Sequence, residues 1–130
     1  MPPERRDLNE PGLWMKHAKS DLAVARSSKV EEILFGTLCF HCQQAAEKAL
    51  KAVLLKHGAE FPPTHSIKLL LELLPPPLSP TPDVVEAAIL SKYTSKGRYP
   101  LDVMDIQEDE YEKALKLADG VLRWAEKALR

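Results

Sequence analysis

The chain has 130 residues and a formal net charge of −1 at pH 7, with 45% hydrophobic, 28% charged and 6% aromatic residues. This composition excludes wholesale disorder, and the shortage of aromatic residues favours a helical protein over an all-β sandwich. The near-zero charge argues against a protein that grips duplex nucleic acid through many phosphates, although a local basic patch is compatible with it.

The length predicts one domain, residues 1–130, with a folded core over about residues 11–129 and a flexible segment over residues 1–10. The sequence contains no 18-residue apolar run, and its N-terminus, MPPERRDLNEP, lacks the apolar region of a signal peptide. We therefore expect a cytoplasmic protein that has no contact with a membrane and keeps its thiols reduced.

The first predicted helix runs from about Pro11 to Ser27, with proline in its first turn and Asn9 as a possible cap. Next, residues 28–31 read S-x-x-E, the form of a capping box, which predicts a second helix that begins directly afterwards and reaches His57. Gly58 then supplies a left-handed stop.

Proline clusters bracket two shorter predicted helices, one over residues 65–74 and one from Thr81-Pro82 to about Tyr93. A loop, TSKGRYPLD, precedes a last helix over about residues 107–129, where apolar residues recur at spacings of three and four. The predicted fold is all-α, an antiparallel up-and-down bundle of about five helices.

The stretch CFHC could indicate a metal site, a redox pair or simple packing. Projection of the second helix at 100° per residue places both cysteines, Cys39 and Cys42, in an apolar sector, while His41 points to the opposite side. No second cysteine or histidine pair completes a zinc site, and no preceding strand supports a thioredoxin-like site. We therefore expect both cysteines, like Trp14 and Trp124, to serve packing, in the core or, for the tryptophans, at a dimer contact.

The opposite sector of this helix is polar and contains His41, Gln43, Gln44, Glu47, Lys48 and Lys51. A ridge formed by His41, Gln44, Lys48 and Lys51 could present cations and amides to a phosphate or a base edge. The alternative, which sequence alone favours, is a solvated face on which Glu47 pairs with Lys51. Glu47 itself is better explained as a stabilising partner, or as a buried polar link between helices, than as a catalytic acid.

The run FHCQQAAEKALKAVLLKHGAEFPPTHSIKLLLELL resembles the central signature of the HEPN (higher eukaryotes and prokaryotes nucleotide-binding) domain family, with Cys42 where the family has alanine. Tyr93, the RYP triplet at residues 98–100 and the closing helix match the family in the same order. The resemblance implies a helical bundle that commonly forms a homodimer. It also implies a frequent partner, a minimal nucleotidyltransferase, and a place in toxin–antitoxin or other RNA-directed systems.

Catalytically active members of the family are ribonucleases with an R-x₄₋₆-H motif, and this chain lacks the motif because no histidine follows Arg98. Without the imidazole there is no evident general acid or base for attack by a 2′-hydroxyl group. The resemblance therefore implies a non-catalytic protein that binds a nucleotide, RNA or a nucleotidyltransferase, with no cofactor and no metal. The candidate binding residues are His41, Gln44, Lys48, His65, Arg98 and Tyr99.

Each candidate also has a structural interpretation. Lys48 could be an exposed charge that covers its helix, and His65 could belong to the first turn after a cap. Tyr99 could be an aromatic plug that fixes its loop, while Arg98 beside it could clamp a phosphate. Two other functions remain open: an enzyme with a non-standard site, such as His65 with Arg98, and a purely structural dimer that docks another chain.

Overall fold

The computed structural model describes residues 10–96 and 105–130, and these residues contain helices and turns but no strand. The helices are α1 (Pro11–Ala25), α2 (Phe35–Lys56), α3 (Ile67–Glu72), α4 (Pro82–Glu86), the 3₁₀ helix η2 (Ala87–Lys92), α5 (Tyr93–Lys96) and α7 (Glu108–Ala128). The predicted all-α fold is confirmed. None of the described helices is long and apolar enough to cross a bilayer.

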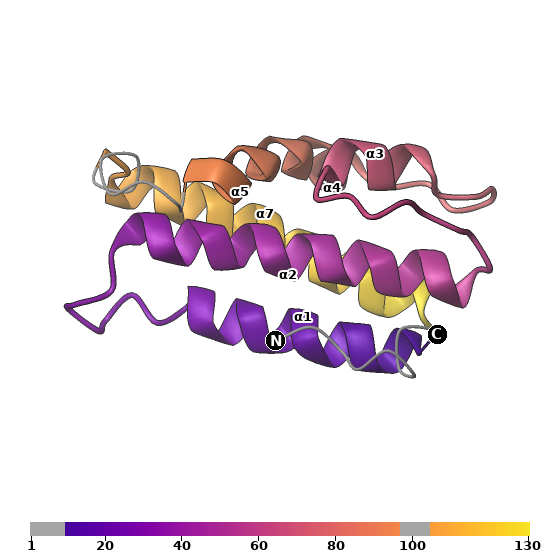
Figure 1. The fold of residues 1–130 in the computed structure, drawn as a ribbon, viewed down its shortest axis with the longest axis horizontal. Coiled ribbons are helices and arrows are strands. Elements are labelled where there is room, and N and C mark those ends of the chain that lie inside the picture. The colour runs from indigo at the N-terminus through magenta and orange to yellow at the C-terminus, as the bar shows by residue number, and fades with distance from the viewer. Residues whose placement is uncertain (1–9, 97–104) are drawn as a thin grey trace.

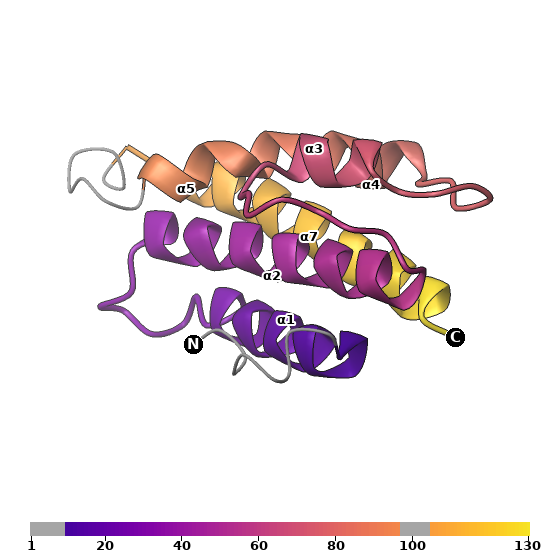
Figure 2. The same ribbon diagram turned by 45° about the vertical axis from the view of Figure 1, so that its right-hand side comes forward.

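The helices form an up-and-down bundle with α2 at its centre (Figure 1). Helices α1 and α2 are antiparallel, the α4–η2–α5 segment runs back along the other side of α2, and α7 returns behind α2 in the view of Figure 1. The turned view in Figure 2 shows α1 on one side of α2 and α3 with α4 on the other. The chain between α2 and α3, residues 57–66, lies along α2 before α3 begins.

The apolar sector predicted for α2 forms the centre of the core, and its alanines let neighbouring helices approach closely. The side chains of Leu38, Cys39, Cys42, Ala45, Ala46, Ala49, Leu50 and Val53 are all fully buried. Helix α7 adds a stripe of buried residues at helical spacing, including Tyr111, Ala118 and Val121. The Tyr111 hydroxyl donates a 2.7 Å hydrogen bond to the carbonyl of Ala25, which ties the end of α1 to α7.

The predicted capping box at residues 28–31 is wrong. Residues 27–34 form turns, and α2 begins at Phe35 after Leu34, which offers no side-chain cap. Tertiary structure explains the difference. The chain must reverse direction between α1 and α2, and it uses residues 27–34 for this reversal, so these residues are not available for a longer α2. Helix α1, by contrast, spans nearly the predicted range, and α2 ends at Lys56, within one residue of the prediction.

The two shorter predicted helices exist with altered detail. Helix α3 is limited to Ile67–Glu72, and its cap is Ser66, whose hydroxyl accepts a 3.2 Å hydrogen bond from the Leu69 N–H. The predicted fourth helix is split into α4, η2 and α5, which extends into the predicted loop. At η2, the Ser91 hydroxyl accepts a hydrogen bond from the Ile67 N–H, which fixes the start of α3 against η2.

Gly58 ends α2 as predicted, with a left-handed φ of 72°. Because the Ala59 N–H donates to the Leu54 carbonyl at 2.9 Å, the turn satisfies a carbonyl at the end of the helix. A Cβ atom on Gly58 would meet nothing within 4 Å, so only the backbone conformation disfavours other residues.

We therefore predict that Gly58→Ala lowers the free energy of unfolding by about 1 kcal/mol, the strain of a left-handed residue with a Cβ atom. Gly12→Ala is the control, because Gly12 has the same open space but no positive φ. Urea denaturation of both variants checks this, and equal stabilities would contradict it.

Candidate functional site

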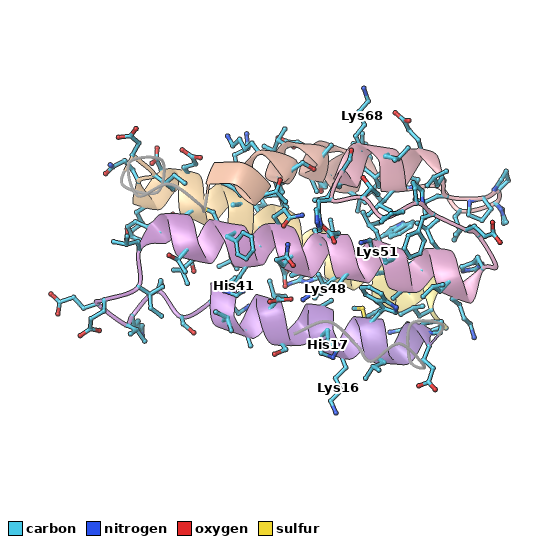
Figure 3. The ribbon with its side chains drawn as sticks, in the orientation of Figure 1. Lys16, His17, His41, Lys48, Lys51 and Lys68 are labelled. Carbon is cyan, nitrogen blue, oxygen red and sulfur yellow. The ribbon has the colours of Figure 1, made fainter. Side chains whose placement is uncertain are left out.

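Two of the predicted ridge residues, His41 and Lys48, meet an acidic residue of α1. Asp21 accepts from His41 Nδ1 through Oδ1 at 3.0 Å and from Lys48 Nζ through Oδ2 at 2.6 Å. Figure 3 shows His41 and Lys48 on the side of α2 that faces α1. Since a carboxylate only accepts, Nδ1 of His41 carries a proton and donates it in a hydrogen bond to Asp21.

The pairing at Asp21 is largely shielded from solvent. The side chains of Lys48 and Asp21 are 12% and 14% exposed, and that of His41 is 27% exposed. Burial raises the pKa of Asp21, but the hydrogen bonds and positive charges of His41 and Lys48 outweigh it, so the pKa lies below its ordinary value. Asp21 is therefore a carboxylate at neutral pH, and its charge already neutralises Lys48.

A second cluster on α2 surrounds Glu47. Its Oε1 accepts from Gln43 Nε2 at 2.8 Å and from His65 Nδ1 at 2.9 Å, and its Oε2 accepts from Lys51 Nζ at 2.9 Å. Gln44 joins the network by donating to Gln43 Oε1 at 2.7 Å. Because His65 lies in the chain that follows α2, the cluster fastens residues 57–66 to the middle of that helix.

Lys51 is held by rings as well as by charge. Its ammonium group lies 5.6 Å from the ring centres of Trp14 in α1 and of Phe61 in the segment after α2. Rings attract a cation through their negative faces, and this attraction grows when the cation is shielded from water. Trp14, 9% exposed, is thus a core residue, as predicted. Trp124 is half-buried and packs against the same core.

The prediction of a solvated polar face on α2 is wrong for three of its members: Gln43, Glu47 and Lys51 are buried, at 0%, 3% and 7% exposure. The predicted i,i+4 pair between Glu47 and Lys51 does form, but inside the protein, so Glu47 is the buried polar link between elements. The cause is that α2 is covered on several sides, by α1, by residues 57–66 and by α7.

The structure brings together His41 and Lys48 at Asp21, and Gln44 and His65 around Glu47. Arg98 and Tyr99 lie outside the described residues. Sequence reasoning missed Asp21, whose partners are 20 and 27 residues away. The available signal was its position beside Leu22 on the buried side of α1, where an unpaired carboxylate would be costly.

The two cysteines are buried packing residues, as predicted, and neither forms a disulfide. Burial, with a smaller contribution from neighbouring Cys39, raises the pKa of Cys42 to about 12. A thiol with this pKa is not a nucleophile at neutral pH. Among the described residues, no group of three or more histidine, cysteine, aspartate or glutamate side chains could hold a metal ion.

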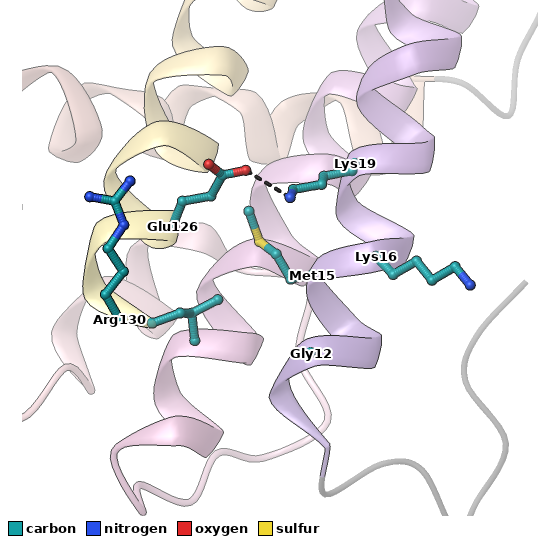
Figure 4. A pocket seen from close by; sticks show the side chains of 7 residues that line it. Gly12, Met15, Lys16, Lys19, Glu126 and Arg130 are labelled. Atoms are coloured by element: carbon teal, nitrogen blue, oxygen red, sulfur yellow. Dashed lines mark ion pairs between the residues drawn. The ribbon is translucent and has the colours of Figure 1, made fainter.

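A hollow between the start of α1 and the end of α7 offers little for ligand recognition (Figure 4). Met15 lies within it, Lys19 is paired with Glu126 at 2.9 Å, and Lys16 points away from it. Lys19 and Glu126 thus neutralise each other, which leaves Arg130 as the other charged residue of the lining besides Lys16, and the polar clusters on α2 remain the candidate site.

The HEPN domain model matches residues 12–128, which include both polar clusters. The chain belongs to the HEPN family. None of the curated proteins compared with the chain matches it. This chain is therefore a member of the family in which the R-x₄₋₆-H motif is missing.

Two solved structures resemble this HEPN protein over nearly its whole length. TT1696 from Thermus thermophilus is 35% identical, with a TM-score of 0.84 over 93% of this chain and 99% of its own. ST0689, an archaeal HEPN homologue, is 29% identical, with a TM-score of 0.78 over 93% of this chain and 98% of its own. The bundle is thus a shared fold of the family.

We predict that Asp21→Asn makes the protein less stable at pH 7 by roughly 1–3 kcal/mol, since Lys48 loses its partner in a shielded place. The pKa of Asp21 is lower in the folded protein than in the unfolded chain. Its contribution to the free energy of unfolding is therefore complete above the unfolded pKa of about 3.9, and it disappears as the pH falls through the pKa of the folded protein. In urea denaturation between pH 7 and pH 3, the free energy of unfolding should therefore fall less steeply with decreasing pH for the variant than for the wild-type chain.

The control for Asp21→Asn is Glu126→Gln, which removes an ion pair between α1 and α7 whose side chains are 58% and 45% exposed. Exposed pairs contribute about 0–1 kcal/mol. Equal losses in the two variants would contradict a special role for Asp21.

We predict that Glu47→Gln destabilises the fold by roughly 3 kcal/mol, because it leaves the buried ammonium group of Lys51 without its anion. Adding Lys51→Met removes that stranded charge, so the double variant should lose less stability than the two single losses added together. Denaturation of the four proteins in this cycle measures the coupling, and strictly additive losses would refute it.

Proposed function

We propose that this protein is a non-catalytic, homodimeric HEPN protein that binds a protein partner of the minimal nucleotidyltransferase class, in a toxin–antitoxin-like module. The observation that supports this best is the internal neutralisation of the polar clusters. Lys48 is paired with Asp21, and Lys51 is paired with Glu47. A phosphate that used either cation would have to displace a carboxylate that is already bound to it.

The same pairing argues against catalysis at these clusters. The Nδ1 atoms of His41 and His65 are both engaged by carboxylates, and the carboxylates themselves are engaged by lysines. These contacts join α2 to α1 and to residues 57–66. In the proposal they hold these elements in fixed positions, so that the surface around α2 is rigid. Rigid elements hold a binding surface more accurately than loops do.

The exposed edge of the clusters is the proposed contact. The side chain of His65 is 68% exposed although its Nδ1 is fixed by Glu47, and Gln44 is half-buried beside the same network. Arg98 and Tyr99 are included among the proposed binding residues on the strength of the family resemblance alone. In this proposal Lys48 does not contact the partner: its ion pair with Asp21 holds α1 in place against α2.

A nucleotide or RNA is the second candidate, and one observation favours it. His65 offers solvent an imidazole whose ring is oriented by Glu47, and such a ring can stack on a base or donate to it. Binding of this kind would use an exposed ring and would leave the lysine pairs intact.

The test first asks whether a minimal nucleotidyltransferase is encoded beside this protein, as the proposal expects, and then titrates the two proteins by calorimetry. We expect a complex, and we expect His65→Ala combined with Arg98→Ala to weaken it by about tenfold or more, as loss of two central contacts does. The control is His65→Gln, whose amide can still donate to Glu47. Circular dichroism of each variant verifies that the bundle is folded.

Three results would overturn the proposal. They are the lack of a nucleotidyltransferase gene on either side, unchanged affinity in the His65 and Arg98 variant, and cleavage of RNA by the purified protein. A thermal-shift screen with nucleotides separates the second candidate, because a nucleotide that binds the folded state raises the melting temperature.

A further inference from the structure

The surface between α4 and α7 carries charges of opposite sign on its two walls. A hollow of about 320 Å³ lies there. Asp83 and Glu86 of α4 form the acidic wall. Lys113, Lys116 and Arg123 of α7 form a mainly basic wall, which also contains Asp119, the ion-pair partner of Arg123.

Leu117 and Gly120 of α7 also line this hollow. A Cβ atom placed on Gly120 would meet nothing within 4 Å, so the space above this glycine is open. The absent side chain lets another backbone or a long side chain approach the helix closely.

The charges on these walls are available for a new partner. Lys113 and Glu86 form a 3.4 Å ion pair across the hollow, but their side chains are 61% and 49% exposed. Because an exposed ion pair adds little to stability, each residue can form a pair with a partner molecule instead. Asp83 and Lys116 make no ion pair with any other part of the chain that the structure describes. Arg123 pairs with Asp119 at 2.8 Å and remains 78% exposed.

Apolar side chains lie exposed on the same helical segment. Val85 of α4 and Ile89 of η2 are 51% and 43% exposed, while Val84, Ala87 and Leu90 of the same stretch are buried. Neither residue lines the hollow, so these two apolar side chains belong to the same segment but lie outside the charged walls. The surface of the hollow thus combines an acidic wall with a mainly basic one.

We propose that a second copy of this chain docks on this surface, with the acidic wall of each protomer against the basic wall of its partner. An isologous interface about a two-fold axis requires a self-complementary surface, in which residue i meets residue j and j meets i. The α4–α7 walls meet this requirement. Other partners fit this surface less well. The carboxylates of Asp83 and Glu86 would repel the phosphates of a nucleic acid, and a uniformly acidic or basic protein would be repelled by the wall that has its own sign of charge.

This inference rests on the homodimer of the proposed function and assigns its interface. The closing experiment uses two variants of the full chain. In the first, Asp83→Lys and Glu86→Lys make both walls basic, and in the second, Lys113→Glu and Lys116→Glu make both walls acidic. Like charges placed across an interface oppose association, so each variant alone should have a dimer dissociation constant raised by about tenfold or more.

An equimolar mixture of the two variants should restore the dimer, because the all-basic copy then meets the all-acidic copy. Analytical ultracentrifugation at low salt measures all three samples, and recovery in the mixture excludes misfolding as the cause of monomers. The control, Lys16→Glu combined with Lys29→Glu, reverses two exposed charges on α1 and the loop after it and should leave the dimer intact.

Dimers in both reversed variants would overturn this interface while leaving the homodimer in place. Monomers that stay monomeric in the mixture would also overturn it. A wild-type chain that is monomeric throughout would overturn the homodimer as well, whereas binding of the nucleotidyltransferase is measured separately and does not depend on this result.

Discussion

The structure depends on one buried negative charge, that of Glu47 in the middle of α2. A carboxylate in this position is destabilising unless donors surround it, and three donors do so: Gln43, Lys51 and His65. Two of them come from α2 itself, while His65 comes from the segment that follows. Satisfying this charge therefore fixes the path of residues 57–66 and places Phe61 against the ammonium group of Lys51.

Asp21 applies the same constraint to the other side of α2. Its carboxylate is satisfied only when α1 lies beside His41 and Lys48, so pairing specifies how the two helices align in addition to stabilising them. Alanines on the apolar sector of α2 allow close approach but define alignment weakly, since small side chains interdigitate little. The polar clusters thus supply a specificity that the core does not.

The sequence predicts most of the fold for a physical reason that also explains its failures. Helix limits at Pro11 and Gly58, and the stripe on α7, follow from local propensities and spacing, which are written in neighbouring residues. The start of α2 depends on a chain reversal, and the burial of Gln43, Glu47 and Lys51 depends on what covers them. Neither is encoded locally, so a helical projection correctly gives the direction of each side chain but not whether that direction faces water.

The same distinction limits what could be predicted of the candidate site. The family signature marks Gln44, Lys48 and His65 as a group, yet it does not separate residues that bind a ligand from residues that hold the bundle together. The contacts add the structural part of the answer: Lys48 holds α1 against α2, and His65 has both a fixed nitrogen and an exposed ring.

Three of the four histidines in the chain use a ring nitrogen in contacts that join separate elements. His41 bridges to α1, His65 joins the segment after α2 to Glu47, and His57 Nε2 donates to the Ala128 carbonyl at the end of α7 over 3.0 Å. The fold therefore uses three imidazoles to hold separate elements together, and no histidine follows Arg98. These contacts fix α2 against α1, α7 and residues 57–66, and they thereby position the outer surfaces that the proposed binding to other chains would use.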